Sequence, residues 1–294
     1  GKIPNPGRIS LSPMLTYKGK LYGDLTISCL DENEFLIFGS GAAQEMHRRW
    51  FESHIKKFNV NYKNRSDDFH GIGIAGPKSR DLLQKIVRED VSNSNLKFRD
   101  SRRMFVAGVP AVINRISFTG ELGYEIYVAP HFQIKLFEEI MEAGKEFNIK
   151  PFGSRALMSM RLEKNWGAWT LDYRPDFTAK ETGLDKFINW NKEFIGKESA
   201  EKDICQNKLV PLMVETNEID VTYNEAVMKG DKSIGYITSG GFAHFVNKSV
   251  AFSYLNTKEL NSEKGIQVEI NGDLFNCAII KEPLYDPSGQ KMRS

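Results

Sequence analysis

The chain has 294 residues, 40% of them hydrophobic and 27% charged, and its 40 basic residues nearly balance 38 acidic ones. This length allows roughly two domains with a sizeable core. A net charge of +2 argues against a surface built for nucleic acid or for a membrane. No apolar run reaches the roughly 18 residues of a membrane helix.

The three cysteines, Cys29, Cys205 and Cys277, are odd in number and form no C-x-x-C pair. We therefore expect no disulfide framework and no metal site. A reducing compartment follows, which means the cytoplasm, or the mitochondrial matrix if the source is eukaryotic.

The first half of the chain alternates between strand and helix signals. In chain order the patterns predict a hairpin over 15–30 with its turn at 18–20, a strand over 34–38, a helix over 42–58, a strand and a helix over 71–86, strands within 103–127, and a helix over 130–147. Ser154 is expected to cap a further helix that runs to about Glu163.

From Lys208 onward the chain shows only short strands and turns. Alternating apolar residues with closely spaced turns are typical of a small β-barrel or sandwich. The sequence thus predicts an α+β part followed by an all-β part.

The segment RISFTGELGYEIYV, residues 115–128, predicts a strand, a turn and a second strand. Glu125 lies between Tyr124 and Ile126, so its side chain points to the opposite face of that strand. A carboxylate there is costly unless it meets water or a partner. Glu125 is therefore either a surface glutamate or the acceptor for a ligand that carries N–H donors.

Asp24 lies in LYGDLTI, where alternation places it on one strand face with Tyr22 and Thr26. Beside a buried Tyr22 its carboxylate can orient or activate an amine nucleophile. The alternative is a solvated strand face.

Three further features have both a functional and a structural interpretation. Arg155 and Arg161 can bind ligand oxygens or form ion pairs, for example with the nearby Glu163. Trp166, Trp169 and Trp190 can stack on a planar heterocycle or fill the core. The G-x-G-x-x-G match at 71–76 overlaps an apolar strand, so we interpret it as a strand that leads into a turn and not as a dinucleotide site.

Taken in order, six segments resemble the aminomethyltransferase family, which comprises the glycine-cleavage T-protein and the folate-binding C-terminal parts of dimethylglycine and sarcosine dehydrogenases. The segments are GKLYGDLTI (19–27), IAGPKSRDLL (74–83), SFTGELGYEI (117–126), GSRALMSMRLEKN (153–165), KETGLDKFINWNKEFIGKESA (180–200) and IGYITSGGF (234–242). The segment GRISLSPMLTYKGKLYGDLTI, residues 7–27, resembles the dehydrogenase branch more closely than the glycine-cleavage branch.

The resemblance implies an α+β fold with three domains in a cloverleaf ring around tetrahydrofolate, and a C-terminal all-β barrel. The expected domains are 1–62 with 153–205, then 63–152, then 206–294. It implies Asp24 as the catalytic residue. It also implies a set of residues that bind the cofactor: Glu125, Arg155, Tyr22, Phe38, Ser40, Phe118 and Trp169.

The sequence departs from the T-protein pattern at five positions. The T-protein has a tyrosine where this chain has Leu36, Phe118 and Trp169. It has an asparagine in place of Ser40 and a tryptophan in place of Lys186. These changes argue against the glycine-cleavage reaction itself and leave folate binding intact. The dehydrogenase branch carries an FAD domain before the point that matches Gly1, so we expect an upstream flavin domain or a shortened relative.

The resulting expectation is a folate-dependent one-carbon transferase that captures the carbon of an N-methylated glycine as 5,10-methylenetetrahydrofolate. Its partners would be a small amine or methyl donor, with FAD only if a flavin domain precedes it, and neither nucleic acid nor membrane. Two alternatives stay open: a tetrahydrofolate-dependent demethylase of a sulfonium or methyl ether, and a folate-binding module without catalysis.

Overall fold

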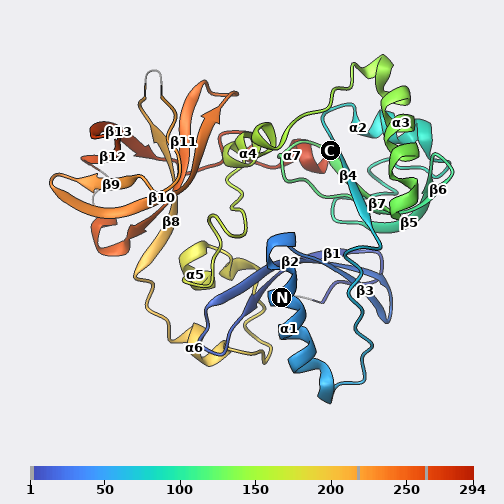
Figure 1. Ribbon diagram of the computed structural model, residues 1–294, viewed down its shortest axis with the longest axis horizontal. Helices are drawn as coiled ribbons and strands as arrows, with labels where there is room; N and C mark the ends of the chain where they lie inside the picture. The colour runs from blue at the N-terminus through green and yellow to red at the C-terminus, as the bar shows by residue number, and fades with distance from the viewer. Residues whose placement is uncertain (1–2, 217–218, 262–263) are drawn as a thin grey trace. The chain divides into compact units, whose positions relative to one another are not determined.

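A computed structural model describes residues 3–216, 219–261 and 264–294 (Figure 1). The chain forms two compact units. Unit 1 comprises Ser12–Leu25 and Gly153–Pro287, and unit 2 comprises Ile3–Leu11, Thr26–Phe152 and Ser288–Ser294. The three domain boundaries expected from the sequence stay a prediction.

Near the N-terminus β1 (Ile9–Leu15), β2 (Leu21–Asp31) and β3 (Glu34–Phe38) form a sheet in that order. The predicted hairpin and the following strand are therefore confirmed. The turn between β1 and β2 needs Gly19, because its φ of +73° is left-handed and a Cβ there would lie 2.7 Å from the backbone nitrogen of Ala200.

The centre of unit 2 is a four-stranded sheet with the order β4-β7-β6-β5, antiparallel throughout. Its elements are β4 (His70–Ala75), α2 (Ser79–Ile86), β5 (Ser101–Val106), β6 (Val109–Asn114), β7 (Gly123–Val128) and α3 (Gln133–Gly144), and α1 (Gln44–His54) precedes them. The G-x-G-x-x-G segment is indeed a strand, β4, that ends at the turn of Gly76 before α2.

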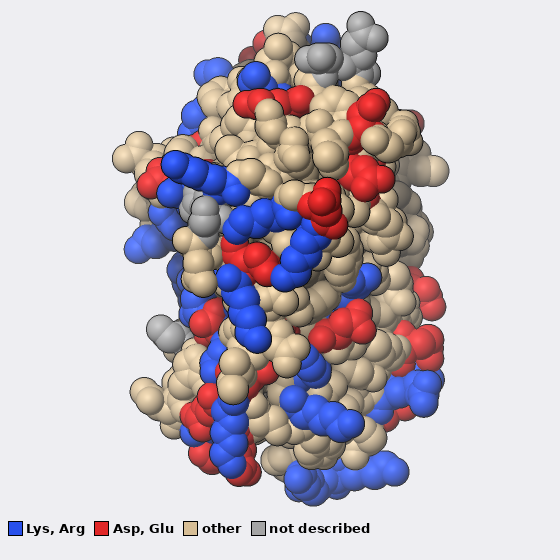
Figure 2. Space-filling model, turned by 90° about the vertical axis from the view of Figure 1, so that its left-hand side faces the viewer, with Lys and Arg blue, Asp and Glu red and all other residues tan. Residues whose placement is uncertain are grey.

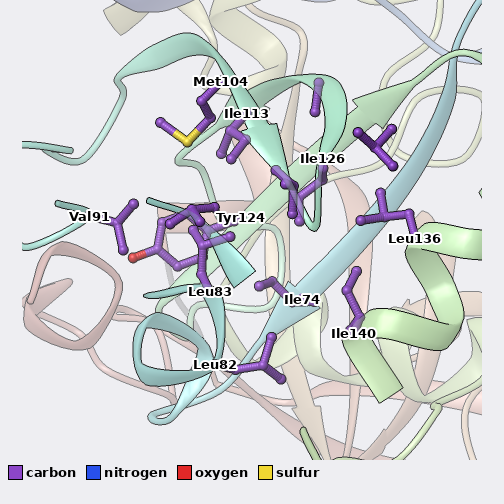
Figure 3. Close-up of a cluster of buried hydrophobic side chains, with 14 of the residues drawn as sticks. Ile74, Leu82, Leu83, Val91, Met104, Ile113, Tyr124, Ile126, Leu136 and Ile140 are labelled. Atoms are coloured by element: carbon purple, nitrogen blue, oxygen red, sulfur yellow. The ribbon is translucent and has the colours of Figure 1, made fainter. Parts of the chain in front are cut away.

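One face of this sheet is the core of unit 2. Alternate residues such as Ile74, Tyr124 and Ile126 point to that face, where Leu83 of α2 and Leu136 of α3 cover them (Figure 3). Strand alternation sends the remaining residues of the same strands to the opposite face. That second face carries Glu125.

Unit 1 contains a closed barrel in which neighbouring strands follow the order β10-β11-β8-β13-β12-β9 (Figure 1). The strands are β8 (Asn207–Val214), β9 (Ala226–Lys229), β10 (Lys232–Ala243), β11 (Lys248–Asn256), β12 (Ile266–Ile270) and β13 (Asp273–Ile279). The predicted β-barrel is confirmed. Strand β9 has no signal of its own in the sequence, because four residues are too few for a periodic pattern.

Helix α4 (Ser154–Glu163) and the short helices α5 (Ala179–Thr182) and α6 (Lys197–Glu201) precede the barrel in the chain. The short helix α7 (Gln290–Arg293) follows the barrel. The cap expected at Ser154 was wrong, because Gly153 occupies the N-cap position and makes no side-chain cap. At the other end of α4, the Glu163 carboxylate accepts a hydrogen bond of 2.6 Å from the Phe245 nitrogen.

A buried polar network attaches α4 to the barrel. Asp172 is completely buried and pairs with the equally buried Arg161 of α4. The hydroxyls of Thr238 and Ser239 of β10 donate to the Asp172 carboxylate at 2.5 and 2.6 Å. Arg161 is therefore an internal ion-pair partner, which is the structural one of its two interpretations.

Cys29, Cys205 and Cys277 are free thiols. Within residues 3–216, 219–261 and 264–294, no group of three or more His, Cys, Asp or Glu side chains is arranged to hold a metal ion. In the same described ranges no helix has the length and apolarity needed to cross a membrane.

Candidate functional site

Glu125 lies at the middle of β7 on the face opposite the core of unit 2, as its position between Tyr124 and Ile126 predicts. Its register neighbours are Gly73 on β4 and Asn114 on β6. The side chain is half-buried, and this burial raises the pKa of the Glu125 carboxyl. A carboxylate held away from water in this way is an acceptor ready for donors supplied by a ligand.

The hydroxyl of Tyr127 donates a hydrogen bond of 2.6 Å to Oε2 of Glu125. Tyr127 follows Glu125 by two residues, so both side chains leave β7 on the same face. Phe38, the last residue of β3, stacks on the Tyr127 ring with centroids 4.4 Å apart and planes inclined by 29°. Phe38, a predicted site residue, thus reaches Glu125 through Tyr127, which is not among the predicted site residues.

Two glycines of β4 shape the space beside this pair. A Cβ at Gly71 would lie 3.0 Å from Cε1 of Tyr127, so the tyrosine ring covers that position. At Gly73, the register neighbour of Glu125, a Cβ would meet no atom within 4 Å. The strand therefore leaves open space next to the Glu125 carboxylate.

Filling that space should block a ligand of Glu125 without harming the fold. We expect Gly73→Val to weaken ligand binding at least about 10-fold, or ~1.4 kcal/mol, and Gly73→Ala to weaken it less. Gly73 has no left-handed φ and a Cβ meets no neighbour, so neither variant should unfold at a lower temperature than the wild type. Equal affinities for all three proteins in a calorimetric titration with tetrahydrofolate would show that the ligand does not occupy this space.

Asp24 lies on β2 in unit 1, between the buried Gly23 and Leu25. Burial raises the pKa of its carboxyl from 3.8 to about 7. The buried Tyr173 lies within electrostatic range, because the charge of Asp24 helps to raise the pKa of the Tyr173 hydroxyl. An aspartate that titrates near neutrality can exchange protons or charge during a reaction, as a general acid–base group must.

The other predicted site residues divide between the two units. In unit 1, Tyr22 is half-buried on the Asp24 face of β2. Trp169 is buried, and its backbone forms an isolated parallel β-bridge with Tyr173. Arg155 lies exposed on the first turn of α4 with no ion-pair partner among the described residues. In unit 2, Ser40 and Phe118 are half-buried in loops.

Unit 1 also holds a pocket of about 510 Å³. Trp166, Tyr173 and Phe252 supply aromatic walls, and Lys186 and Lys208 supply cationic groups. Of the tryptophans considered in the sequence, Trp166 is the one that lines this space. A pocket of this composition suits an apolar body with an anionic group.

Figure 2 shows Lys and Arg interspersed with Asp and Glu over the face that it presents. A mixed surface of this kind does not produce the one-signed field with which proteins attract nucleic acid.

Comparison with protein families matches the two parts of the chain in turn. The GCVT N-terminal domain matches residues 2–192, and the glycine cleavage T-protein C-terminal barrel domain matches residues 207–286. The chain belongs to the aminomethyltransferase (glycine-cleavage T-protein) family. The family resemblance found in the sequence is thereby confirmed.

Among relatives in this family, mitochondrial dimethylglycine dehydrogenase of Homo sapiens is 36% identical over 290 residues, which are 96% of this chain and 33% of that protein. The chain thus spans about a third of the length of that relative. The aminomethyltransferase of Desulfitobacterium hafniense (strain Y51) is 31% identical, covering 96% of this chain and 78% of the relative.

The crystal structure of the glycine cleavage system aminomethyltransferase T from Bartonella henselae matches the fold. The TM-score is 0.85 over 97% of this chain and 78% of that chain, at 19% sequence identity. The predicted fold, an α+β part with a C-terminal β-barrel, is confirmed.

Proposed function

We propose that this member of the aminomethyltransferase family is a tetrahydrofolate-dependent one-carbon transferase that captures the carbon of an N-methylated glycine as 5,10-methylenetetrahydrofolate. Family membership supports the cofactor, and the similarity to dimethylglycine dehydrogenase supports the donor. The observation that carries the proposal is the Glu125 carboxylate, half-buried on the second face of the sheet beside the open space at Gly73.

The residues around Glu125 fit the pterin ring of folate. A pterin presents neighbouring N–H and amino donors in one plane, and an ionised carboxylate accepts two such hydrogen bonds side by side. Tyr127 occupies one lone pair of Oε2, so further acceptor positions of both oxygens can face the space at Gly73. Phe38 and Tyr127 add aromatic surface for a planar ring.

Asp24 is the proposed catalytic residue. When bound, tetrahydrofolate would supply two amine nitrogens, N5 and N10, to accept a donor carbon already oxidised from the N-methyl to the iminium level, and the donor amine would leave with the proton of each nitrogen. The ionised Asp24 would stabilise the positive charge that accompanies this exchange. By the family resemblance, Arg155 would bind a polar oxygen of the folate, and Tyr22, Ser40, Phe118 and Trp169 are further proposed folate-binding residues.

The donor and any further domain belong to the same proposal. We propose a small N-methylated amine as donor, and an FAD-containing domain elsewhere in the protein that oxidises it, because the dimethylglycine dehydrogenase relatives are about three times as long as this chain. The chain would then act in the mitochondrial matrix or the cytoplasm.

Glu125→Ala tests the proposed function directly. Leaving the pterin donors without their charged acceptor should cost roughly 1.5–3 kcal/mol, or about 10- to 150-fold in affinity, in a calorimetric titration of tetrahydrofolate. Glu139→Ala, on the exposed surface of α3, is the matched control and should bind like the wild type. A wild-type chain without saturable binding below about millimolar would refute folate binding.

A donor assay separates this proposal from its alternatives. Wild-type protein supplied with tetrahydrofolate and a formaldehyde-equivalent donor should form 5,10-methylenetetrahydrofolate. Turnover with a methyl sulfonium or a methyl ether instead would identify a demethylase. Folate binding without turnover on any donor would identify a binding module.

A further inference from the structure

The ring of Tyr127 is held at two places besides its hydroxyl. Phe38 stacks on it at 4.4 Å, and β4 passes next to it at Gly71, where even a Cβ would come within 3.0 Å. Turning the ring away would break the stack with Phe38. The hydroxyl is therefore kept 2.6 Å from Oε2 of Glu125 by contacts that do not involve Glu125 itself.

We propose that Tyr127 is a positioning residue, which holds the Glu125 carboxylate ionised and turned toward the space at Gly73 so that it accepts hydrogen bonds from the ligand. The inference rests on the proposed function, because the ligand in question is folate. It adds a residue that acts through Glu125 and need not touch the folate.

In the surroundings of Glu125 in unit 2, this hydroxyl favours the ionised form of the carboxyl against the effect of burial. Burial and the Tyr127 hydrogen bond are the two causes that act on the pKa of Glu125, burial raising it and the hydrogen bond lowering it. The register neighbours Gly73 and Asn114 do not titrate, and Phe38 is apolar. Arg103 of β5 shares this face of the sheet but forms an ion pair with Glu34.

Tyr127→Phe removes the hydroxyl and keeps the ring with its stacking and packing. We expect tetrahydrofolate to bind about 10-fold more weakly at pH 7. We also expect a changed pH profile. Without the donor the pKa of Glu125 rises, so on acidification the carboxylate is neutralised, and binding is lost, at a higher pH than in the wild type.

Two further variants separate positioning from a merely structural role. Tyr62→Phe deletes the hydroxyl of another half-buried tyrosine of unit 2 and should leave both the affinity and the pH profile unchanged. In a Glu125→Gln background, Tyr127→Phe should cost much less than in the wild type, and no pH shift should remain. An equal cost in both backgrounds would show that Tyr127 does not act through Glu125.

The pKa of Glu125 can also be measured without a ligand, by following its carboxyl ¹³C resonance with pH and assigning it through the Glu125→Gln variant. A higher value in Tyr127→Phe than in the wild type is expected, and an unchanged value would overturn the inference. If wild-type protein binds folate through Glu125 while Tyr127→Phe matches it at every pH, the inference alone fails. If the wild type does not bind folate, the proposed function fails with it.

Discussion

Replacing Asp24 by asparagine should lower the rate of carbon transfer about 100- to 10,000-fold while tetrahydrofolate still binds. The variant keeps the volume of the side chain and removes the charge that would stabilise the cationic donor carbon. The rate is measured as single-turnover formation of 5,10-methylenetetrahydrofolate at saturating tetrahydrofolate. The affinity for tetrahydrofolate is measured separately by calorimetric titration. A rate within a few-fold of the wild type would remove Asp24 from the catalytic role.

The same residue should determine the pH dependence of the reaction. Because the pKa of Asp24 is raised to about 7, its carboxylate is largely neutral below that pH and ionised above it. The single-turnover rate of the wild type should therefore rise through about pH 7. A rate that falls over this range would mean that Asp24 acts in its protonated form.

Burying this carboxylate also has a consequence for stability. Its pKa is about 7 in the folded chain, against the ordinary value of 3.8, so the unfolded chain ionises first as the pH rises. The folded state accordingly loses stability between these two pH values and keeps the full penalty above them. Asp24→Asn should therefore unfold at a higher temperature than the wild type above pH 7, with no such gain below pH 4.

The second large effect concerns the network that attaches α4 to the barrel. Asp172→Ala should lower the free energy of unfolding by about 3–5 kcal/mol, because Arg161 would stay buried with its charge uncompensated. Both side chains are essentially inaccessible to solvent, and Thr238 and Ser239 would lose their acceptor as well. Chemical denaturation followed by tryptophan fluorescence measures the change.

The control for this prediction is Glu193→Ala, which deletes a surface ion pair with Lys197 at 2.9 Å. The Glu193 side chain is 91% exposed, so the change should stay below about 1 kcal/mol. An Asp172→Ala variant as stable as this control would show that the network does not hold α4 to the barrel. Replacing both partners by apolar residues, as in Arg161→Met with Asp172→Leu, should recover much of the lost stability.

Local pattern was sufficient for much of this protein. Alternation between apolar and polar residues placed Glu125 on the side of β7 away from Tyr124 and Ile126, and the hairpin, the β4 strand and the all-β character of the C-terminal part also follow from short-range periodicity. The order of the six segments was enough to identify the family.

Other features were decided by contacts between residues far apart in the chain. Strand alternation sends Tyr127 to the Glu125 face, but only the folded sheet shows that Phe38 stacks on its ring and that Gly71 makes room for it. Arg161 had two interpretations until folding brought Asp172, Thr238 and Ser239 around it. Periodicity reports which face a side chain takes, whereas its partners, its burial and hence its pKa depend on which segments meet, and that is a property of the tertiary structure.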